Sequence, residues 1–157
     1  MTSGTMRGAL AGAAGTTALN AATYLDMALR ARPASDSTQQ LVEHAAGRAR
    51  VPIPGDKDER GNRLQGLGPL SGIAVGVAVG AAVGALHGML ARRGRSLPVA
   101  AEVPLIAAMA MALSDVPLKL LGISDPGSWA AGDWASDAIP HLLYGAVPYS
   151  VLRSAEA

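Results

Sequence analysis

The sequence contains no cysteine and no phenylalanine, and only 3% of its 157 residues are aromatic. Without cysteine, the chain has no disulfide, no thiolate metal ligand and no cysteine nucleophile. Charged residues are also scarce, at 16%, and the net charge is only +1. No basic run is interleaved with aromatic residues, so we expect no binding to nucleic acid. The chain is 50% hydrophobic, but it lacks the large side chains that usually fill an aqueous core.

One apolar stretch, residues 66–91, organises the rest of the chain. Its only residue that can carry a charge is His87. A four-residue step returns to nearly the same face of an α-helix. Glycine recurs with that step at Gly68, Gly72, Gly76, Gly80, Gly84 and Gly88. Interior glycine weakens a helix in water, whereas a bilayer enforces the helix and a glycine face admits a second backbone closely. The pattern predicts a transmembrane helix that packs through glycine, within one bundle or between copies; a glycine face lining a pore is the alternative.

Three more apolar stretches extend this pattern over the whole chain. We predict an all-α fold, a polytopic membrane helical bundle forming one domain over residues 1–157 and placed multi-pass in the cell (plasma) membrane. Its four transmembrane helices are expected at about residues 8–29, 66–91, 98–121 and 126–153. Gly8 and Gly12 give the first helix a small stripe of its own, which suits packing on the later glycine face.

The stretch over residues 31–65 is the one long polar segment of the sequence. Asp36 with Gln39 three positions later resembles a capping box, and Gly47 is a plausible helix stop. We therefore predict a short amphipathic helix in this first loop, lying on the membrane. Residues 51–63 mix prolines, glycines and charges of both signs, which is typical of a loop.

The last predicted helix carries the one group of side chains that could transfer protons or bind a ligand. Asp133, Asp137 and His141 are spaced four and four, and Tyr144 follows three residues later, so the four form a column on one face. A carboxylate, an imidazole and a phenol in line suit a proton relay, a cation or a polar headgroup. The plainer interpretation places Asp133 and Asp137 at the wet interface and has His141 hydrogen-bond a neighbouring helix.

Two charged residues of the preceding helix are expected near the same membrane boundary, because a tight connection joins the two helices. Asp115 and Lys119 are four residues apart, and we predict that they pair. Together with the column they complete the candidate polar or ion site. One histidine with two carboxylates on a single helix lacks the convergent ligands that zinc or iron takes. We predict no metal, no cofactor and no catalytic residue, and we expect His87 on the opposite side of the membrane.

Several short runs resemble a group of small four-helix membrane proteins common in actinobacteria. The likeness covers roughly residues 8–153. The runs that carry it are Asn62-Arg63 with Gly66 and Gly68, Ser114-Asp115-Val116-Pro117, Asp125-Pro126 with Trp129, and Asp137 with Pro140-His141-Leu142 and Tyr144-Gly145. The resemblance implies a four-helix membrane architecture and no catalytic role.

Two classes of function remain open from the sequence. The first is a structural or accessory membrane protein, embedded in the lipid bilayer, whose glycine faces build a bundle, a homo-oligomer or a complex with another membrane protein. The second is a small transporter or proton- or cation-conducting protein that uses the polar column. No nucleotide, hydrolase or metalloprotease motif is present, so we expect no enzymatic activity.

Overall fold

The computed structural model describes residues 4–154, which form helices and their connections without a β-strand. The elements follow in the order α1 (Gly4–Arg30), α2 (Ser37–Ala49), α3 (Lys57–Arg92), α4 (Val99–Leu120), the 3₁₀ turn η1 (Pro126–Ser128) and α5 (Ala131–Ser154). The predicted all-α fold and helical bundle are confirmed, and a short helix does lie in the first loop.

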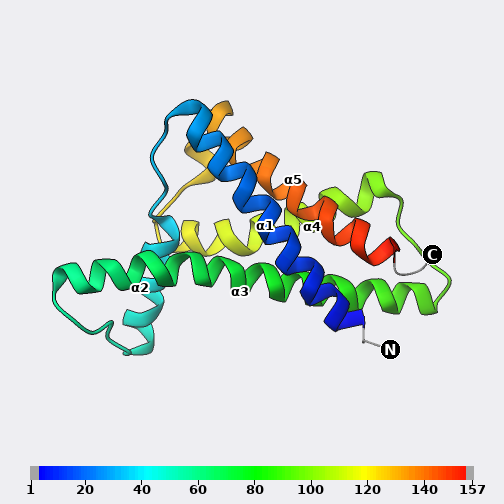
Figure 1. Ribbon diagram of the computed structural model, residues 1–157, viewed down its shortest axis with the longest axis horizontal. Coiled ribbons are helices and arrows are strands. Elements are labelled where there is room, and N and C mark those ends of the chain that lie inside the picture. Colours follow the sequence, from blue (N-terminus) through cyan, green and yellow to red (C-terminus); the bar gives the residue numbers. More distant parts are fainter. Residues whose placement is uncertain (1–3, 155–157) are drawn as a thin grey trace.

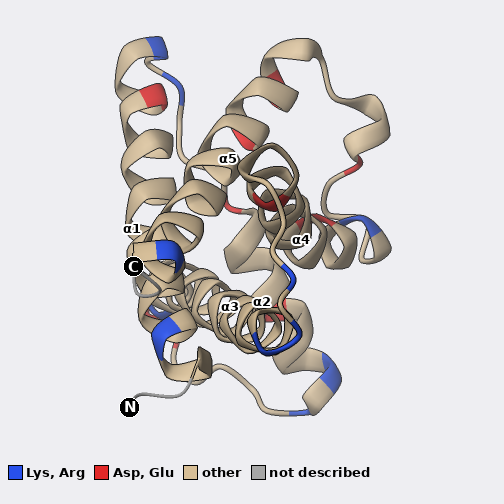
Figure 2. Ribbon diagram, turned by 90° about the vertical axis from the view of Figure 1, so that its right-hand side faces the viewer, with Lys and Arg blue, Asp and Glu red and all other residues tan. Residues whose placement is uncertain are grey.

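The helices form a layer over one long helix (Figure 1). Figure 2 looks nearly along α3 and shows α5 between α1 and α4, with α3 beneath them. The buried side chains at the centre come from α3, α4 and α5: Val79, Val83, Ile106, Ala110, Tyr144 and Leu152. α2 crosses the first half of α3 instead of joining the layer (Figure 1).

The second predicted helix begins earlier than the sequence analysis placed it, at Lys57 instead of residue 66. Asp56 caps it by accepting hydrogen bonds from the backbone N–H groups of Asp58 (3.0 Å) and Glu59 (2.9 Å). The Glu59 side chain in turn accepts the N–H of Asp56, which completes a capping box. A strong local cap therefore outweighs the polar composition that predicted a loop here.

The last predicted helix begins later, at Ala131 instead of residue 126. Asp125 accepts the Gly127 N–H at 3.0 Å and closes the 3₁₀ turn over residues 126–128. The chain is then extended at Trp129, with φ −70° and ψ 137°, so the turn cannot continue as an α-helix. The Trp129 indole packs edge-on against Trp134, with 5.2 Å between the ring centroids.

The ends of α2 also differ from their prediction. Asp36 precedes the helix but makes no side-chain cap, so the predicted capping box with Gln39 does not form. The helix continues past Gly47 to Ala49, and Arg50 ends it in a left-handed conformation with φ 56°. The Arg50 N–H then bonds back to the Gly47 carbonyl at 3.2 Å. A local backbone bond ends this helix, and glycine is not needed for it.

Two helices of the described chain, α3 and α4, are long and apolar enough to cross a membrane. Four were predicted. α1 and α5 fall short of that measure, because threonines and Asn20 dilute the apolar residues of α1, and Asp133, Asp137 and His141 do so in α5.

Candidate functional site

Three of the six candidate polar residues meet between α4 and α5. His141 Nδ1 lies 2.8 Å from the Asp137 carbonyl oxygen and 3.4 Å from Asp137 Oδ1, one turn earlier on α5. Asp115 reaches this pair from α4, and its carboxyl group lies beside that of Asp137. The side chains of His141 and Asp137 are only 11% and 22% exposed. We call Asp115, Asp137 and His141 the acid–histidine cluster.

The two carboxyl groups of this cluster would repel each other if both were ionised. Ionised carboxylates only accept hydrogen bonds, and two of them side by side repel. Asp137 Oδ2 is buried, and no donor within the described part of the chain reaches it. A proton or a cation between the two carboxyl groups would remove this repulsion. No three histidine, aspartate or glutamate side chains of residues 4–154 are grouped closely enough to hold a metal ion.

Lys119 does not pair with Asp115, so the predicted ion pair is wrong. Its Nζ lies 3.1 Å from Asp125 Oδ1 instead, on the exposed turn after α4. The chain reverses there through Gly122, at φ +69°, and brings Asp125 back to Lys119 while Asp115 faces α5. The Gly127 N–H and the Lys119 ammonium hold the pKa of Asp125 below its ordinary value.

Asp133 lies outside the cluster as well. Its Oδ2 accepts the backbone N–H of Ala130 at 3.0 Å, at the exposed start of α5. This bond satisfies one of the donors that every helix N-terminus leaves free. The predicted column therefore divides: its first residue serves the helix end, and its next two enter the cluster.

Tyr144, the last residue of the predicted column, joins three helices. Its hydroxyl donates to the Gly76 carbonyl of α3 at 2.6 Å, and the residue is only 1% exposed. Its ring lies against Gly15 of α1, where an added Cβ would come within 3.0 Å of ring carbon Cδ2. The Tyr144 phenol therefore joins packed helices, and among the described residues no hydrogen bond links it to the acid–histidine cluster.

The glycines of α1 and α3 meet backbone to backbone. A Cβ added at Gly8 would lie 2.7 Å from the Gly84 Cα, and one added at Gly12 would lie 2.9 Å from the Gly80 Cα. Seen from α3, a Cβ on Gly84 would lie 2.6 Å from the Gly8 Cα. Real Cβ atoms do not approach other atoms that closely, so glycine is required on both helices. α1 and α3 are consequently in closer contact than side chains would allow.

The other glycines of the same stripe have different surroundings. Gly68 faces α2, where an added Cβ would lie 3.0 Å from both Gln39 Cγ and Thr38 Oγ1. Nothing lies within 4 Å of a Cβ at Gly72, and Gly88 would meet only the side chain of Arg92, at 3.7 Å. The six-glycine stripe is thus divided between two partner helices and an open segment.

A second buried polar pair was missed in the sequence analysis. His87 Nδ1 of α3 lies 3.0 Å from Glu102 Oε1 of α4, with side chains 12% and 9% exposed. His87 stands five residues before the end of α3, and Glu102 three residues after the start of α4. A short connection joins these helices, and the two residues are separated from it by similar numbers of residues. This similarity was a signal in the sequence that their side chains would meet.

Comparison of the chain with protein-family models, with curated proteins and with solved structures finds no match.

Proposed function

We propose that the protein is a multi-pass protein of the cell membrane, in which α1, α3, α4 and α5 cross the bilayer and form a structural or accessory bundle. The observation that carries this proposal is the backbone contact of α1 with α3 at Gly8, Gly12, Gly80 and Gly84. Small residues at such positions are the usual basis of helix association in lipid, where apolar burial gives little driving force. The bilayer is the first partner, and a second copy or another membrane protein would use the remaining helix faces.

The outward faces of the helices support a lipid environment. Large apolar side chains point away from the bundle, among them Leu10 (65% exposed), Leu113 (51%) and Ile139 (56%). Such a surface is unfavourable in water, since full burial of a side chain of this size is worth about 1.5–3 kcal/mol and these side chains remain more than half exposed. In a bilayer the same side chains meet hydrocarbon and carry no such penalty.

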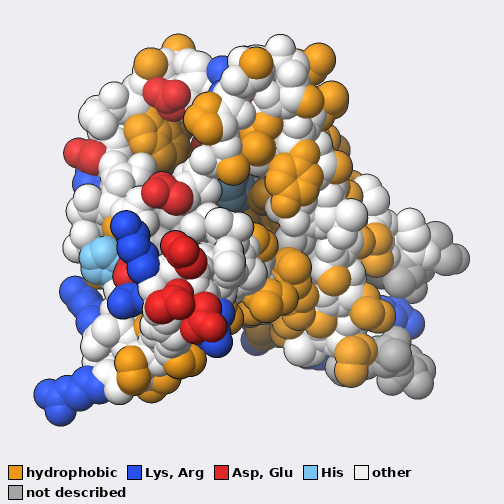
Figure 3. Space-filling view, turned by 60° about the vertical axis from the view of Figure 1, so that its left-hand side comes forward, with side chains coloured by type: hydrophobic (Ala, Val, Ile, Leu, Met, Phe, Trp, Pro, Cys, Tyr) orange, Lys and Arg blue, Asp and Glu red, His pale blue; other side chains and the backbone are white. Residues whose placement is uncertain are grey.

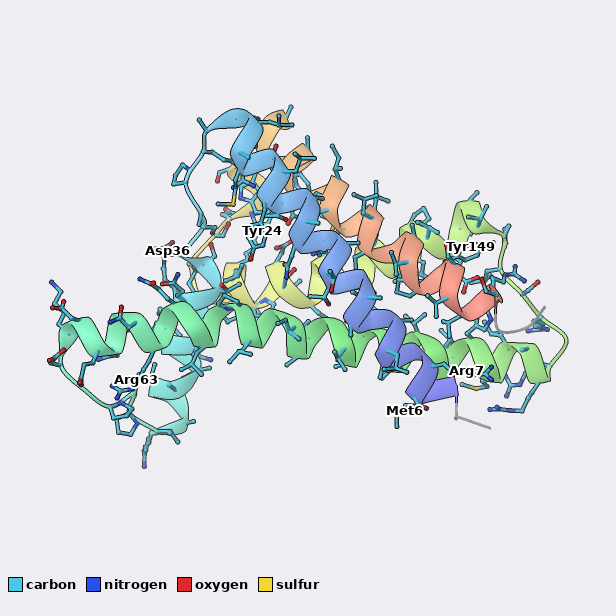
Figure 4. The ribbon with its side chains drawn as sticks, viewed as in Figure 1. Met6, Arg7, Tyr24, Asp36, Arg63 and Tyr149 are labelled. Carbon is cyan, nitrogen blue, oxygen red and sulfur yellow. The ribbon has the colours of Figure 1, made fainter. Side chains whose placement is uncertain are left out.

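The charged residues lie where a membrane would leave them. No aspartate, glutamate, lysine or arginine occurs in residues 8–25, 64–91, 103–114 or 138–152. Figure 4 shows Asp36 and Arg63 towards one end of α3 and Arg7 towards its other end. Figure 3 shows charged side chains gathered over the left-hand part of one face, most densely at its lower left, and hydrophobic ones mainly over its right-hand part. Three acids lie inside the proposed spans: Glu102 and Asp137 each have a histidine partner, and Asp115 lies beside Asp137.

The helix lengths agree with this placement. At 1.5 Å per residue, the 22 residues of α4 span about 33 Å, close to the ~30 Å hydrocarbon thickness. The 36 residues of α3 reach about 54 Å, so its polar first turns and α2 would stand outside the lipid.

Cysteine labelling tests the proposed four-span topology, because the natural chain contains no cysteine. Ser35→Cys, Ser96→Cys and Ser128→Cys place one thiol each in successive exposed connections. In sealed vesicles, an impermeant maleimide should label Ser35→Cys and Ser128→Cys from one side and Ser96→Cys only from the other. Labelling of all three from the same side would contradict the proposal.

A second candidate function, proton or cation transport, is favoured by one observation: the acid–histidine cluster contains a buried carboxylate oxygen without a donor. A transported proton or monovalent cation would occupy this position, with the imidazole of His141 as the neighbouring relay group. The plain structural role of the cluster, joining α4 to α5, needs no transport.

Reconstituted vesicles distinguish the two roles of the cluster. If it transports, His141→Gln should keep the parent fold and lose pH-dependent flux, and Asp133→Asn should keep both, because Asp133 serves only the start of α5. Equal flux in the parent and in His141→Gln, or no flux in either, would leave the structural bundle as the function.

A further inference from the structure

A cavity lies between α3 and α4, at the end of the bundle opposite the acid–histidine cluster. Its volume is about 210 Å³. Apolar side chains of both helices line it: Val83, Leu86 and Leu90 from α3, and Leu105, Ile106 and Met109 from α4. Among the described residues, His87 and Glu102 are the only ionisable groups in its wall. The cavity is therefore a hydrocarbon-lined space with a single polar position.

The polar position has a defined geometry. Glu102 Oε1 lies 3.0 Å from His87 Nδ1, and Glu102 as a whole is only 6% exposed. The nearby guanidinium of Arg153 donates to the Leu97 carbonyl at 3.0 Å and lies over the Tyr149 ring, 5.6 Å from its centroid. Arg153 does not belong to the cavity wall, although Leu97 does.

The charge of the pair decides which ligands it accepts. With Glu102 ionised, the pair is neutral when His87 is protonated and carries −1 when it is not. It is positive in neither state, so it does not attract an anion, and in the −1 state it attracts a cation or a hydrogen-bond donor. A charge-assisted bond to a carboxylate is about twice as strong as a neutral one.

We propose that this cavity binds a compact lipophilic amine. The ammonium group donates to the Glu102 carboxylate, and the hydrocarbon part lies against the leucine, isoleucine and methionine side chains. The volume is sufficient, since an engineered apolar cavity of about 150 Å³ holds benzene. Neutral apolar molecules fit the same walls but forgo the bond to Glu102.

Fluorine NMR of 4-fluorobenzylammonium tests this proposal. The purified full chain in detergent micelles should give saturable binding that empty micelles do not give. The isosteric 4-fluorobenzyl alcohol should bind at least tenfold more weakly, and 4-fluorobenzoate should not bind. Equal binding of amine and alcohol would show a non-selective apolar cavity and overturn the proposal, as would the absence of saturable amine binding.

Two variants locate the binding. Glu102→Gln removes the charge but keeps an oxygen that accepts from His87, and it should weaken amine binding at least tenfold while leaving circular dichroism and melting near those of the parent. Met109→Trp keeps Glu102 and fills the cavity with an indole ring, so it should abolish binding. Unchanged amine affinity in a folded sample of either variant would refute this site.

Discussion

Replacing Gly80 with alanine should destabilise the bundle, although alanine is the better helix former. A Cβ at Gly80 would lie 2.5 Å from the Cα and 2.7 Å from the N of Gly12, and these backbone atoms cannot swing aside. Carbon atoms prefer about 3.5–4.0 Å, so α1 and α3 would have to separate by about 1 Å. Overpacking of this kind costs about 1–3 kcal/mol. For a chain of this size that corresponds to a loss of about 2–12 °C in Tm.

Gly72→Ala is the matched control, because the same substitution on the same helix meets open space. Nothing lies within 4 Å of a Cβ at Gly72, and alanine improves helix propensity by up to about 1 kcal/mol. Thermal unfolding of both variants, followed by circular dichroism in the same micelles, should show opposite or clearly unequal shifts. Melting of Gly80→Ala at or above the Tm of Gly72→Ala would refute the close backbone contact between α1 and α3. Gly80→Leu should enlarge the defect and also disrupt assembly.

Three further substitutions test a buried hydrogen bond, a helix cap and an ion pair. Tyr144→Phe removes the bond to the Gly76 carbonyl and should lower the free energy of unfolding by about 0.5–1.5 kcal/mol; Tyr24→Phe, at a side chain 58% exposed, should leave melting unchanged. Asp56→Ala should cost about 1 kcal/mol as fraying at the start of α3, seen as faster amide exchange in residues 57–63 and not in residues 76–84. The pKa of Asp125 is lowered in the folded protein, so its stabilising contribution is present above the ordinary carboxyl pKa and is lost as the pH falls below about 4. At low salt, the parent should therefore melt above Asp125→Asn at pH 7 and converge with it in acid; a constant difference at every pH would be the contrary result.

The helical class could be predicted from the sequence, because long apolar runs and a four-residue glycine step indicate helices without knowledge of the tertiary packing. The sequence also placed Gly8 and Gly12 as partners for the later glycine stripe, and the structure brings these residues against Gly80 and Gly84. Periodicity identifies the face of a helix, but it does not say how far the contact extends. Periodicity therefore could not show that Gly68 packs against α2 or that nothing lies within 4 Å of a Cβ at Gly72.

The polar site was harder to predict, because it depends on side-chain choices among close alternatives. Lys119 could reach Asp115 by helical spacing or Asp125 across a turn, and the tight reversal at Gly122 favours the second. Asp133 has the spacing of the column, yet its place at the helix start gives it a backbone partner. Tertiary packing decides such competitions, and spacing along one helix cannot.

The most direct test of the membrane bundle is the reactivity of one thiol in the middle of α3. Ala78 is exposed in the isolated bundle, between the buried residues Gly76 and Val79. We expect Ala78→Cys in native vesicles to resist an impermeant maleimide from both sides, because lipid covers it, while Ser96→Cys in the exposed connection reacts. After denaturation in detergent, both thiols should react fully. Rapid labelling of Ala78→Cys in intact vesicles would contradict the proposal that α3 crosses the bilayer.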